Sequence, residues 1–199
     1  MLEVGNDSAA AFEELVLRYQ DRLVGLMTHL IGNRDQAEDL AQEVFLRVYR
    51  ARKSYVPGAK FSTWLFTIAN NVASNALRTL ARRHEVRPEA RESGPMGAHP
   101  MEHLAQASSS MMPVRRLAKA ETREIVRLAI ESLGERQRMA VLLNKFEGMC
   151  YADIAEVMDL SPQAVKSLLA RARENLRDVL VPYMERGELP GESLNPNGD

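Results

Sequence analysis

The sequence contains a single cysteine among 199 residues, and it also lacks a long apolar run and any large net charge. One cysteine cannot form an internal disulfide. No stretch is apolar over the length that crosses a bilayer, and no signal peptide is recognisable at the start. We therefore expect a cytoplasmic protein of one or two small domains, since 45% hydrophobic and 27% charged residues suffice for buried cores.

The charge balance restricts how the chain can bind nucleic acid. Its formal net charge is -1, and its pI is about 6.5. A protein that binds DNA unaided is usually basic, because phosphate neutralisation supplies most of the affinity. Any affinity for DNA must therefore come from local basic patches, or from a partner that shares the contact.

Apolar residues recur at helical spacing through most of the chain, and no segment shows the strict alternation of a β-strand. The spacing predicts an all-α fold of two small helical domains, in residues 1–84 and 114–181. Residues 85–113 are rich in Pro, Gly, Ser and Ala without a sustained period, which is typical of a flexible linker. Residues 182–199 are expected to form a flexible tail.

Polar residues that cap helices precede several of the periodic segments. Asp7 or Ser8 can cap the first helix, and Asn33 begins a plausible capping box for the second. Ser161 followed by Pro162 marks the start of the last helix, because proline suits the first helical position. The beginning of that last helix is therefore well specified.

The stretch LSPQAVKSLLARARENLR, residues 160–177, predicts an amphipathic helix with a polar and basic outer face. Taken alone, such a face is more often a solvated surface than a DNA reader. The preceding YADIAEVMDLSPQAV favours the DNA reader, because it supplies a short helix, a three-residue turn, a small Ala155 at the helix crossing and an apolar anchor, Val165. This is the pattern of a helix-turn-helix. The outward or flanking polar side chains are Gln163, Lys166, Ser167, Arg171 and Arg173.

Three segments together resemble a known family. LGERQRMAVLLNKFEGMCYADIAEVMDLSPQAVKSLLARARENLR resembles promoter-binding region 4 of bacterial sigma factors of the extracytoplasmic-function group, which is group 4 of the sigma-70 family. NRDQAEDLAQEVFLRVYRA resembles their core-binding helix of region 2, and FSTWLFTIANNVASNALR resembles the segment that opens and reads the minus-10 element. The chain departs from the family at Cys150, where a Ser or Thr cap is usual, and at Asp159, where the turn usually has Gly.

The resemblance implies a sigma factor that binds core RNA polymerase, recognises the minus-35 and minus-10 promoter elements and promotes strand opening. The helix-turn-helix would then contact the minus-35 element through its five outward or flanking side chains. The second helix has an acidic face that repels DNA and complements an Arg- or Lys-rich protein surface, although a solubilising surface is the alternative. The resemblance implies that this face binds core RNA polymerase through Asp35, Glu38, Asp39, Gln42 and Glu43.

The third helix and the loop before it carry groups that suit an opened DNA strand. Strand opening requires polar contacts to unstacked bases and cations for phosphates. The resemblance implies that Tyr55 holds a flipped base and that Asn71 contacts the minus-10 strand, whereas Asn70 can equally cap the helix or be solvated. Trp64 lies on the apolar stripe and is expected in the core. The expected minus-10 residues are Lys53, Tyr55, Lys60, Asn70, Asn71 and Arg78.

Other functional classes find little support in the sequence. No nucleophile motif or Gly-rich phosphate loop is recognisable, so no enzyme activity and no cofactor are expected. His99 and His103 share a Pro- and Gly-rich segment without a third ligand nearby, so no metal is expected. A free-standing helix-turn-helix regulator is the alternative, but it requires neither the acidic helix nor FSTWLFTIANN. The expected partners are core RNA polymerase, promoter DNA and an anti-sigma factor or other regulator, without membrane insertion.

Overall fold

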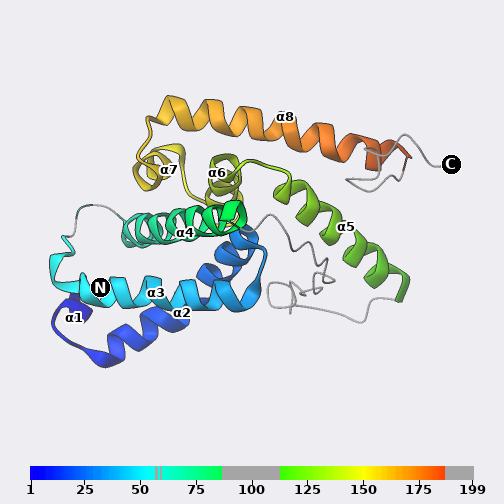
Figure 1. Cartoon of the computed structure of the whole chain (residues 1–199). Helices are drawn as coiled ribbons and strands as arrows, with labels where there is room; N and C mark the ends of the chain where they lie inside the picture. Colours follow the sequence, from blue (N-terminus) through cyan, green and yellow to red (C-terminus); the bar gives the residue numbers. More distant parts are fainter. Residues whose placement is uncertain (57, 59, 87–112, 187–199) are drawn as a thin grey trace.

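Helices make up almost all of the described chain (Figure 1). The computed structural model describes residues 1–56, 58, 60–86 and 113–186. No strand occurs within these residues, which confirms the expected all-α fold. The elements are α1 (Leu2–Gly5), α2 (Ala9–Ile31), α3 (Arg34–Arg50), the short 3-10 helix η1 (Arg52–Ser54), α4 (Phe61–Val86), α5 (Pro113–Glu131), α6 (Glu135–Lys145), α7 (Tyr151–Met158) and α8 (Pro162–Arg186).

The N-terminal helices α2, α3 and α4 pack around one core. Ser8 Oγ accepts a hydrogen bond from the Ala11 amide at 3.3 Å, and Asn33 Oδ1 accepts one from the Gln36 amide at 2.9 Å, so both helix starts confirm predicted caps. Gly32 ends α2 with a φ of 80°, a left-handed conformation that glycine adopts without strain. This tight corner lets α3 fold back along α2.

Helix α4 lies between the α2–α3 pair and the C-terminal helices (Figure 1). The sequence predicts one apolar stripe on this helix, formed by Phe61, Trp64, Leu65, Ile68, Val72, Ala76 and Leu80. Leu65 and Val72 are buried, and the other five are partly buried. A second set, Phe66, Ala69 and Ala73, is also fully buried, and the single apolar stripe of the sequence analysis did not include it. Helix α4 contacts α7 as well as α2 and α3, and the Arg22 guanidinium of α2 lies 5.7 Å from the centroid of the Phe66 ring. The N-terminal and C-terminal helices therefore pack directly against each other.

The C-terminal helices contain the predicted helix-turn-helix in α7 and α8. Cys150 Sγ accepts a hydrogen bond from the Asp153 amide at 3.5 Å, so the cysteine takes the place of a Ser or Thr cap. Asp159 ends α7 in the left-handed conformation with a φ of 52°. Ser161 Oγ then accepts from the Ala164 amide at 3.1 Å and begins α8 with Pro162 in the first turn.

Two helices run further than the sequence predicted. Helix α4 continues through Val86 into the expected linker, and α8 continues through Arg186 into the expected tail. Pro182 lies inside α8, where its missing N–H leaves one helical carbonyl without its usual donor. Val181 and Pro182 are both partly buried. The remainder of the expected linker and tail, 87–112 and 187–199, lies outside the described residues, as do His99 and His103.

Candidate nucleic-acid interface

The outer face of α8 presents the residues predicted to read DNA. Gln163, Lys166 and Arg171 are exposed, while the opposite face of the helix is buried through Val165 and Leu169. This division follows the helical period and gives α8 one face for packing and one for solvent. Within the described residues, the three exposed side chains make no hydrogen bond or ion pair of their own and are available to a ligand.

The other two predicted residues of this face make contacts within the protein. Ser167 is partly buried, and its Oγ donates to the carbonyl of Gln163 at 3.1 Å. Arg173 Nη2 donates to the hydroxyl of Tyr151 at 3.0 Å and so ties the middle of α8 to the start of α7. Arg173 therefore also supports the relative position of the two helices.

Helix α3 carries the acidic face on its N-terminal half. Asp35, Asp39 and Gln42 are exposed. Two carboxylates are engaged in ion pairs four residues along the helix: Glu38 Oε1 lies 2.9 Å from Arg34 Nε, and Glu43 Oε1 lies 2.7 Å from Arg47 Nε. The net negative charge of this face is therefore smaller than its carboxylates alone would give, because two of them are paired with arginines.

Two apolar side chains continue the acidic face, and the sequence analysis did not single them out. Leu46 is 50% exposed and Tyr49 is 41% exposed. They follow Asp39 and Gln42 at intervals of three and four residues, so all four lie on one side of α3. A sequence signal existed, since an apolar residue on the polar face of an amphipathic helix favours a binding surface. The resulting surface is polar at one end and apolar at the other.

The predicted minus-10 residues fall into two groups, and the first faces solvent. Asn71, Arg78 and Lys53 are exposed, although Lys53 Nζ lies 3.5 Å from a carboxylate oxygen of Asp7. Arg78 Nε donates to the carbonyl of Ser74 at 3.2 Å, which holds the side chain along α4. This group remains accessible to a DNA strand.

Tyr55 lies at the edge of an aromatic cluster. Its ring centroid is 5.2 Å from that of Trp64 and 6.0 Å from that of Phe61, both in edge-on arrangements. Tyr55 is half-buried, and Trp64 is partly buried against the core. The cluster fixes the position of the loop before α4.

The second group of minus-10 residues contacts the C-terminal helices. Asn70 Nδ2 donates to the carbonyl of Val157 at 3.3 Å. Lys60 Nζ donates to Asp153 Oδ2 at 2.8 Å, and this hydrogen bond raises the pKa of Lys60 and lowers that of Asp153. The amide and the ammonium group predicted to bind DNA are thus engaged by α7.

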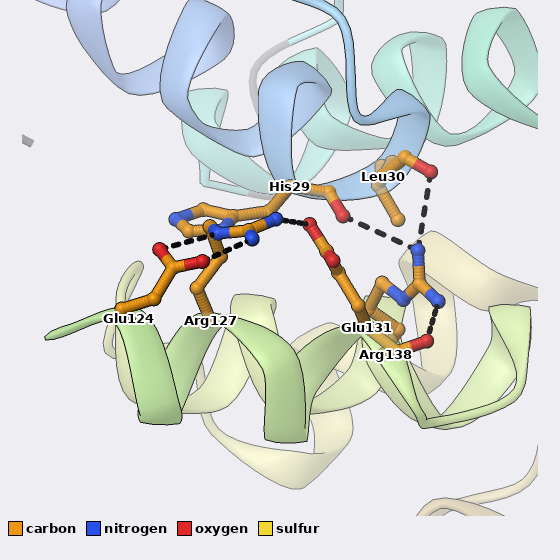
Figure 2. Close-up of polar contacts among 6 residues, drawn as sticks. All are labelled: His29, Leu30, Glu124, Arg127, Glu131 and Arg138. Carbon is orange, nitrogen blue, oxygen red and sulfur yellow. Dashed lines mark hydrogen bonds and ion pairs between the residues drawn. The ribbon is translucent and has the colours of Figure 1, made fainter. Parts of the chain in front are cut away.

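Further polar contacts join the two groups of helices. Arg138 of α6 donates from Nη1 to the carbonyls of His29 and Leu30, at 3.4 and 3.3 Å, and from Nη2 to those of Leu133, at 3.1 Å, and Glu131. Figure 2 shows the Arg138 guanidinium lying between the end of α2 and the end of α5. Helix C-termini carry partial negative charge, so a cation at this point is favourable for both.

A second ion pair connects α2 with the loop after α6. Arg22 Nε donates to Glu147 Oε2 at 2.8 Å. The side chain of Glu147 is only 5% exposed, and burial raises its pKa although Arg22 opposes the shift. The carboxylate therefore depends on Arg22 for its charge compensation.

Two general features bear on function. Within the described residues, no helix is long and apolar enough to cross a membrane. The same residues contain no cluster of three or more His, Cys, Asp or Glu side chains suited to hold a metal ion.

Comparison with known proteins identifies the family. Residues 15–83 match the family Sigma-70 region 2, and residues 123–176 match Sigma-70, region 4. The RNA polymerase sigma-H factor of Pseudomonas aeruginosa is 34% identical over 176 residues, which cover 87% of this chain and 88% of that protein. The ECF RNA polymerase sigma-E factor of Escherichia coli K12 is 34% identical over 176 residues, which cover 88% of this chain and 90% of that protein.

Solved structures share the fold. The sigma factor RpoE in complex with the anti-sigma factor NepR from Bartonella quintana matches with a TM-score of 0.67 and 24% identity, covering 86% of this chain and 97% of that one. CnrH in complex with the cytosolic domain of CnrY matches with a TM-score of 0.63 and 21% identity, covering 90% and 93%. The two matched regions and the curated relatives agree in order and extent, and the chain therefore belongs to the extracytoplasmic-function group of RNA polymerase sigma factors.

Proposed function

We propose that this sigma factor divides its task among three surfaces: α8 reads the minus-35 element, α4 with its preceding loop holds the opened minus-10 strand, and α3 binds core RNA polymerase. The observation that carries the proposal is the face of α8 with Gln163, Lys166 and Arg171. These side chains are exposed and unengaged on a helix whose opposite side is buried in a helix-turn-helix. That arrangement suits insertion into a major groove.

Base reading and phosphate binding are assigned by side-chain chemistry. A neutral amide such as that of Gln163 or Asn71 both donates and accepts, which suits a base edge. Lys166 and Arg171 can bind either a base or a phosphate. Lys53, Lys60 and Arg78 are assigned to the phosphates of the opened strand.

The α3 surface is assigned to polymerase because it combines repulsion of DNA with an apolar anchor. Asp35, Asp39 and Gln42 supply polar contacts, and Leu46 and Tyr49 supply area that is desolvated on binding. Polymerase binding then delivers the two DNA-binding surfaces to the promoter, which a chain of net charge -1 binds weakly by itself.

Regulation and location follow from the same role. The solved relatives RpoE and CnrH are held in complexes with NepR and CnrY, and we extend a protein regulator of this kind to the present chain. Because the chain acts together with RNA polymerase, we assign it to the bacterial cytoplasm. Sigma factors are initiation factors rather than enzymes, and we assign no catalytic step to this chain.

Run-off transcription with bacterial core polymerase tests the proposal. We expect promoter-dependent transcripts, and we expect Arg171→Ala to lose them only on promoters that carry a minus-35 element. Asp39→Lys with Leu46→Ala should weaken binding to core polymerase while helix content stays normal. Tight, sequence-specific binding to duplex DNA by the chain alone at physiological salt would instead support the free-standing regulator.

A further inference from the structure

We propose that Asp7 and Arg52 position Tyr49 for core RNA polymerase, so that the N-terminal segment of the chain takes part in polymerase binding through the apolar anchor on α3. This inference rests on the proposed assignment of the α3 surface to polymerase. Tyr49 lies at the C-terminal end of that surface and is 41% exposed. The two positioning residues lie outside the set that the sequence assigned to polymerase.

Two neighbouring side chains hold the Tyr49 ring. The ring of Phe12, from α2, has its centroid 5.1 Å from that of Tyr49 in a tilted arrangement. The guanidinium carbon of Arg52 lies over the Tyr49 ring at 4.0 Å from its centroid. A ring with such neighbours has fewer conformations than a free surface tyrosine. Less conformational entropy is therefore lost when a partner buries it.

Arg52 is itself fixed by three hydrogen bonds. Its Nη1 donates to the carbonyl of Tyr49 at 2.8 Å, and its Nε and Nη2 donate to Asp7 Oδ1 at 2.8 and 2.6 Å. The carbonyl lies at the C-terminal end of α3, where the helix dipole favours a cation. The Arg52 side chain is only 17% exposed and offers little area to a partner. We therefore assign it a role that acts through Tyr49.

The N-terminal segment brings Asp7 to this arginine. Val4 of α1 is 1% exposed, and a Cβ atom added to Gly5 would lie 3.4 Å from the carbonyl oxygen of Arg52, so α1 packs closely on η1. Asp7 follows with a φ of 65°, a left-handed conformation that Asp tolerates better than most residues. The hydrogen bond from Arg52 lowers the pKa of Asp7, so its carboxylate is ionised at neutral pH.

The Asp7–Arg52 pair is a weak support for the fold as a whole. The Asp7 side chain is 52% exposed, and ion pairs in contact with solvent contribute little to stability. Removal of the Asp7 charge should therefore leave the helices intact. What changes is the restraint on Arg52 and, through it, on the exposed ring of Tyr49. This difference allows a positioning role to be measured separately from folding.

Competition with labelled wild-type chain for core RNA polymerase gives the relative Kd of each full-length variant. The variants are Asp7→Asn, Arg52→Met, Tyr49→Ala and the two double variants that add Tyr49→Ala to each of the others. Asparagine tolerates the left-handed conformation at position 7, and methionine keeps an apolar stem in place of arginine. Glu3→Gln is the matched control, because Glu3 is exposed on α1 and its loss changes the net charge as Asp7→Asn does.

We expect Kd to rise about threefold in Asp7→Asn and about fivefold in Arg52→Met, because Tyr49 must then be immobilised on binding. Tyr49→Ala should raise Kd about tenfold, as the loss of an aromatic anchor does. In the Tyr49→Ala background, neither second substitution should change Kd by more than about 1.5-fold, since no ring is left to position. Glu3→Gln should bind like wild type. A general effect on the fold or on charge would instead multiply with the effect of Tyr49→Ala.

Two results overturn the positioning role: a Kd within about 1.5-fold of wild type in either single variant, or losses that multiply with that of Tyr49→Ala. Circular dichroism checks helix content. If Arg52→Met lowers it, Arg52→Lys, which keeps the cation, takes its place and Asp7→Asn decides.

Tyr49→Ala separates this test from the proposed function. If Tyr49→Ala weakens core binding while Asp7→Asn and Arg52→Met do not, only the positioning role is wrong. If Tyr49→Ala binds core polymerase as tightly as wild type does, the assignment of Tyr49 to the polymerase surface is wrong and the positioning role is wrong with it.

Discussion

Arg138 offers a sharp test of how the helices are held together. Its guanidinium donates to the carbonyls of His29 and Leu30 at the end of α2 and of Glu131 at the end of α5 (Figure 2). It also donates to the carbonyl of Leu133 in the turn before α6. Burial lowers its pKa from the usual range, but an arginine remains protonated at any ordinary pH. Arg138→Met keeps the apolar stem and removes the charge together with all four hydrogen bonds.

The expected loss follows from the geometry. A hydrogen bond from a charged donor contributes about 1.5–3 kcal/mol when it is well formed. The bonds to His29 and Leu30 are 3.4 and 3.3 Å long and lie at the weak end, whereas the bond to Leu133 is 3.1 Å long. Arg138 Nε is buried without a partner in the described residues, so methionine also removes an unfavourable group. We expect the free energy of unfolding to fall by about 2–3 kcal/mol.

Urea unfolding with two probes measures the loss. Circular dichroism follows all helices, and the single tryptophan, Trp64, follows the N-terminal helices by fluorescence. In the variant we expect the two transitions to separate, because the C-terminal helices lose support that α2 provides. Arg136→Met is the matched control, since Arg136 is exposed on the same helix. The assignment of Arg138 is wrong if the two variants unfold alike, within about 0.5 kcal/mol.

Three further substitutions test other parts of the structure. Asn71→Ala should reduce transcription with core polymerase, and a template with its minus-10 region already unpaired should not restore it; full rescue with unchanged base preference would show that Asn71 assists melting or supports the helix. Thr63→Val should raise the melting temperature by the equivalent of about 1 kcal/mol, because Thr63 is 1% exposed and its hydroxyl has no partner in the described residues. A lowered melting temperature would mean that the Thr63 hydroxyl makes a stabilising hydrogen bond. Burial lowers the pKa of His29, Arg127 and Arg138 lower it further, and Glu131 raises it. The contribution of neutral His29 to stability is therefore present above the ordinary pKa of 6.5 and is lost as the pH falls below that value. Glu147 has a raised pKa, so its contribution to stability grows as the pH falls. The measurement is therefore the difference in unfolding free energy between wild type and His29→Gln from pH 7.5 to 5.5. A difference that does not depend on pH contradicts the role given to His29.

Local features of the fold were predictable from the sequence because their causes are local. A cap such as Asn33 or Ser161 accepts a backbone hydrogen bond three residues away, and that distance is fixed by helix geometry. The buried side of α8 was predictable for the same reason, since Val165 and Leu169 recur at the helical period. The departure at Asp159 was also understandable, because Asp tolerates the left-handed conformation that the turn requires.

The second buried face of α4 could not be predicted in the same way. Phe66, Ala69 and Ala73 show that more than one side of the helix is apolar, but helical spacing does not reveal which element covers them. Helix α7, which contacts α4, comes much later in the chain, since Asn70 and Val157 are 87 residues apart. Asn70 illustrates the consequence, since the sequence alone could not decide between a DNA contact and an internal one, and in the structure its amide is engaged by Val157.

Ion pairs within the chain reduce the number of cations that are free to bind DNA phosphates. Two of the cations assigned to phosphates have carboxylates of the same chain beside them: Lys53 lies by Asp7, and Lys60 lies by Asp153. A phosphate must displace these carboxylates, so the free chain has fewer unpaired cations than its composition suggests. Lys60→Gln should make the dependence of single-strand affinity on salt shallower by about 0.7 in the log–log slope, because one phosphate contact is lost. An unchanged slope would mean that Lys60 does not contact the strand.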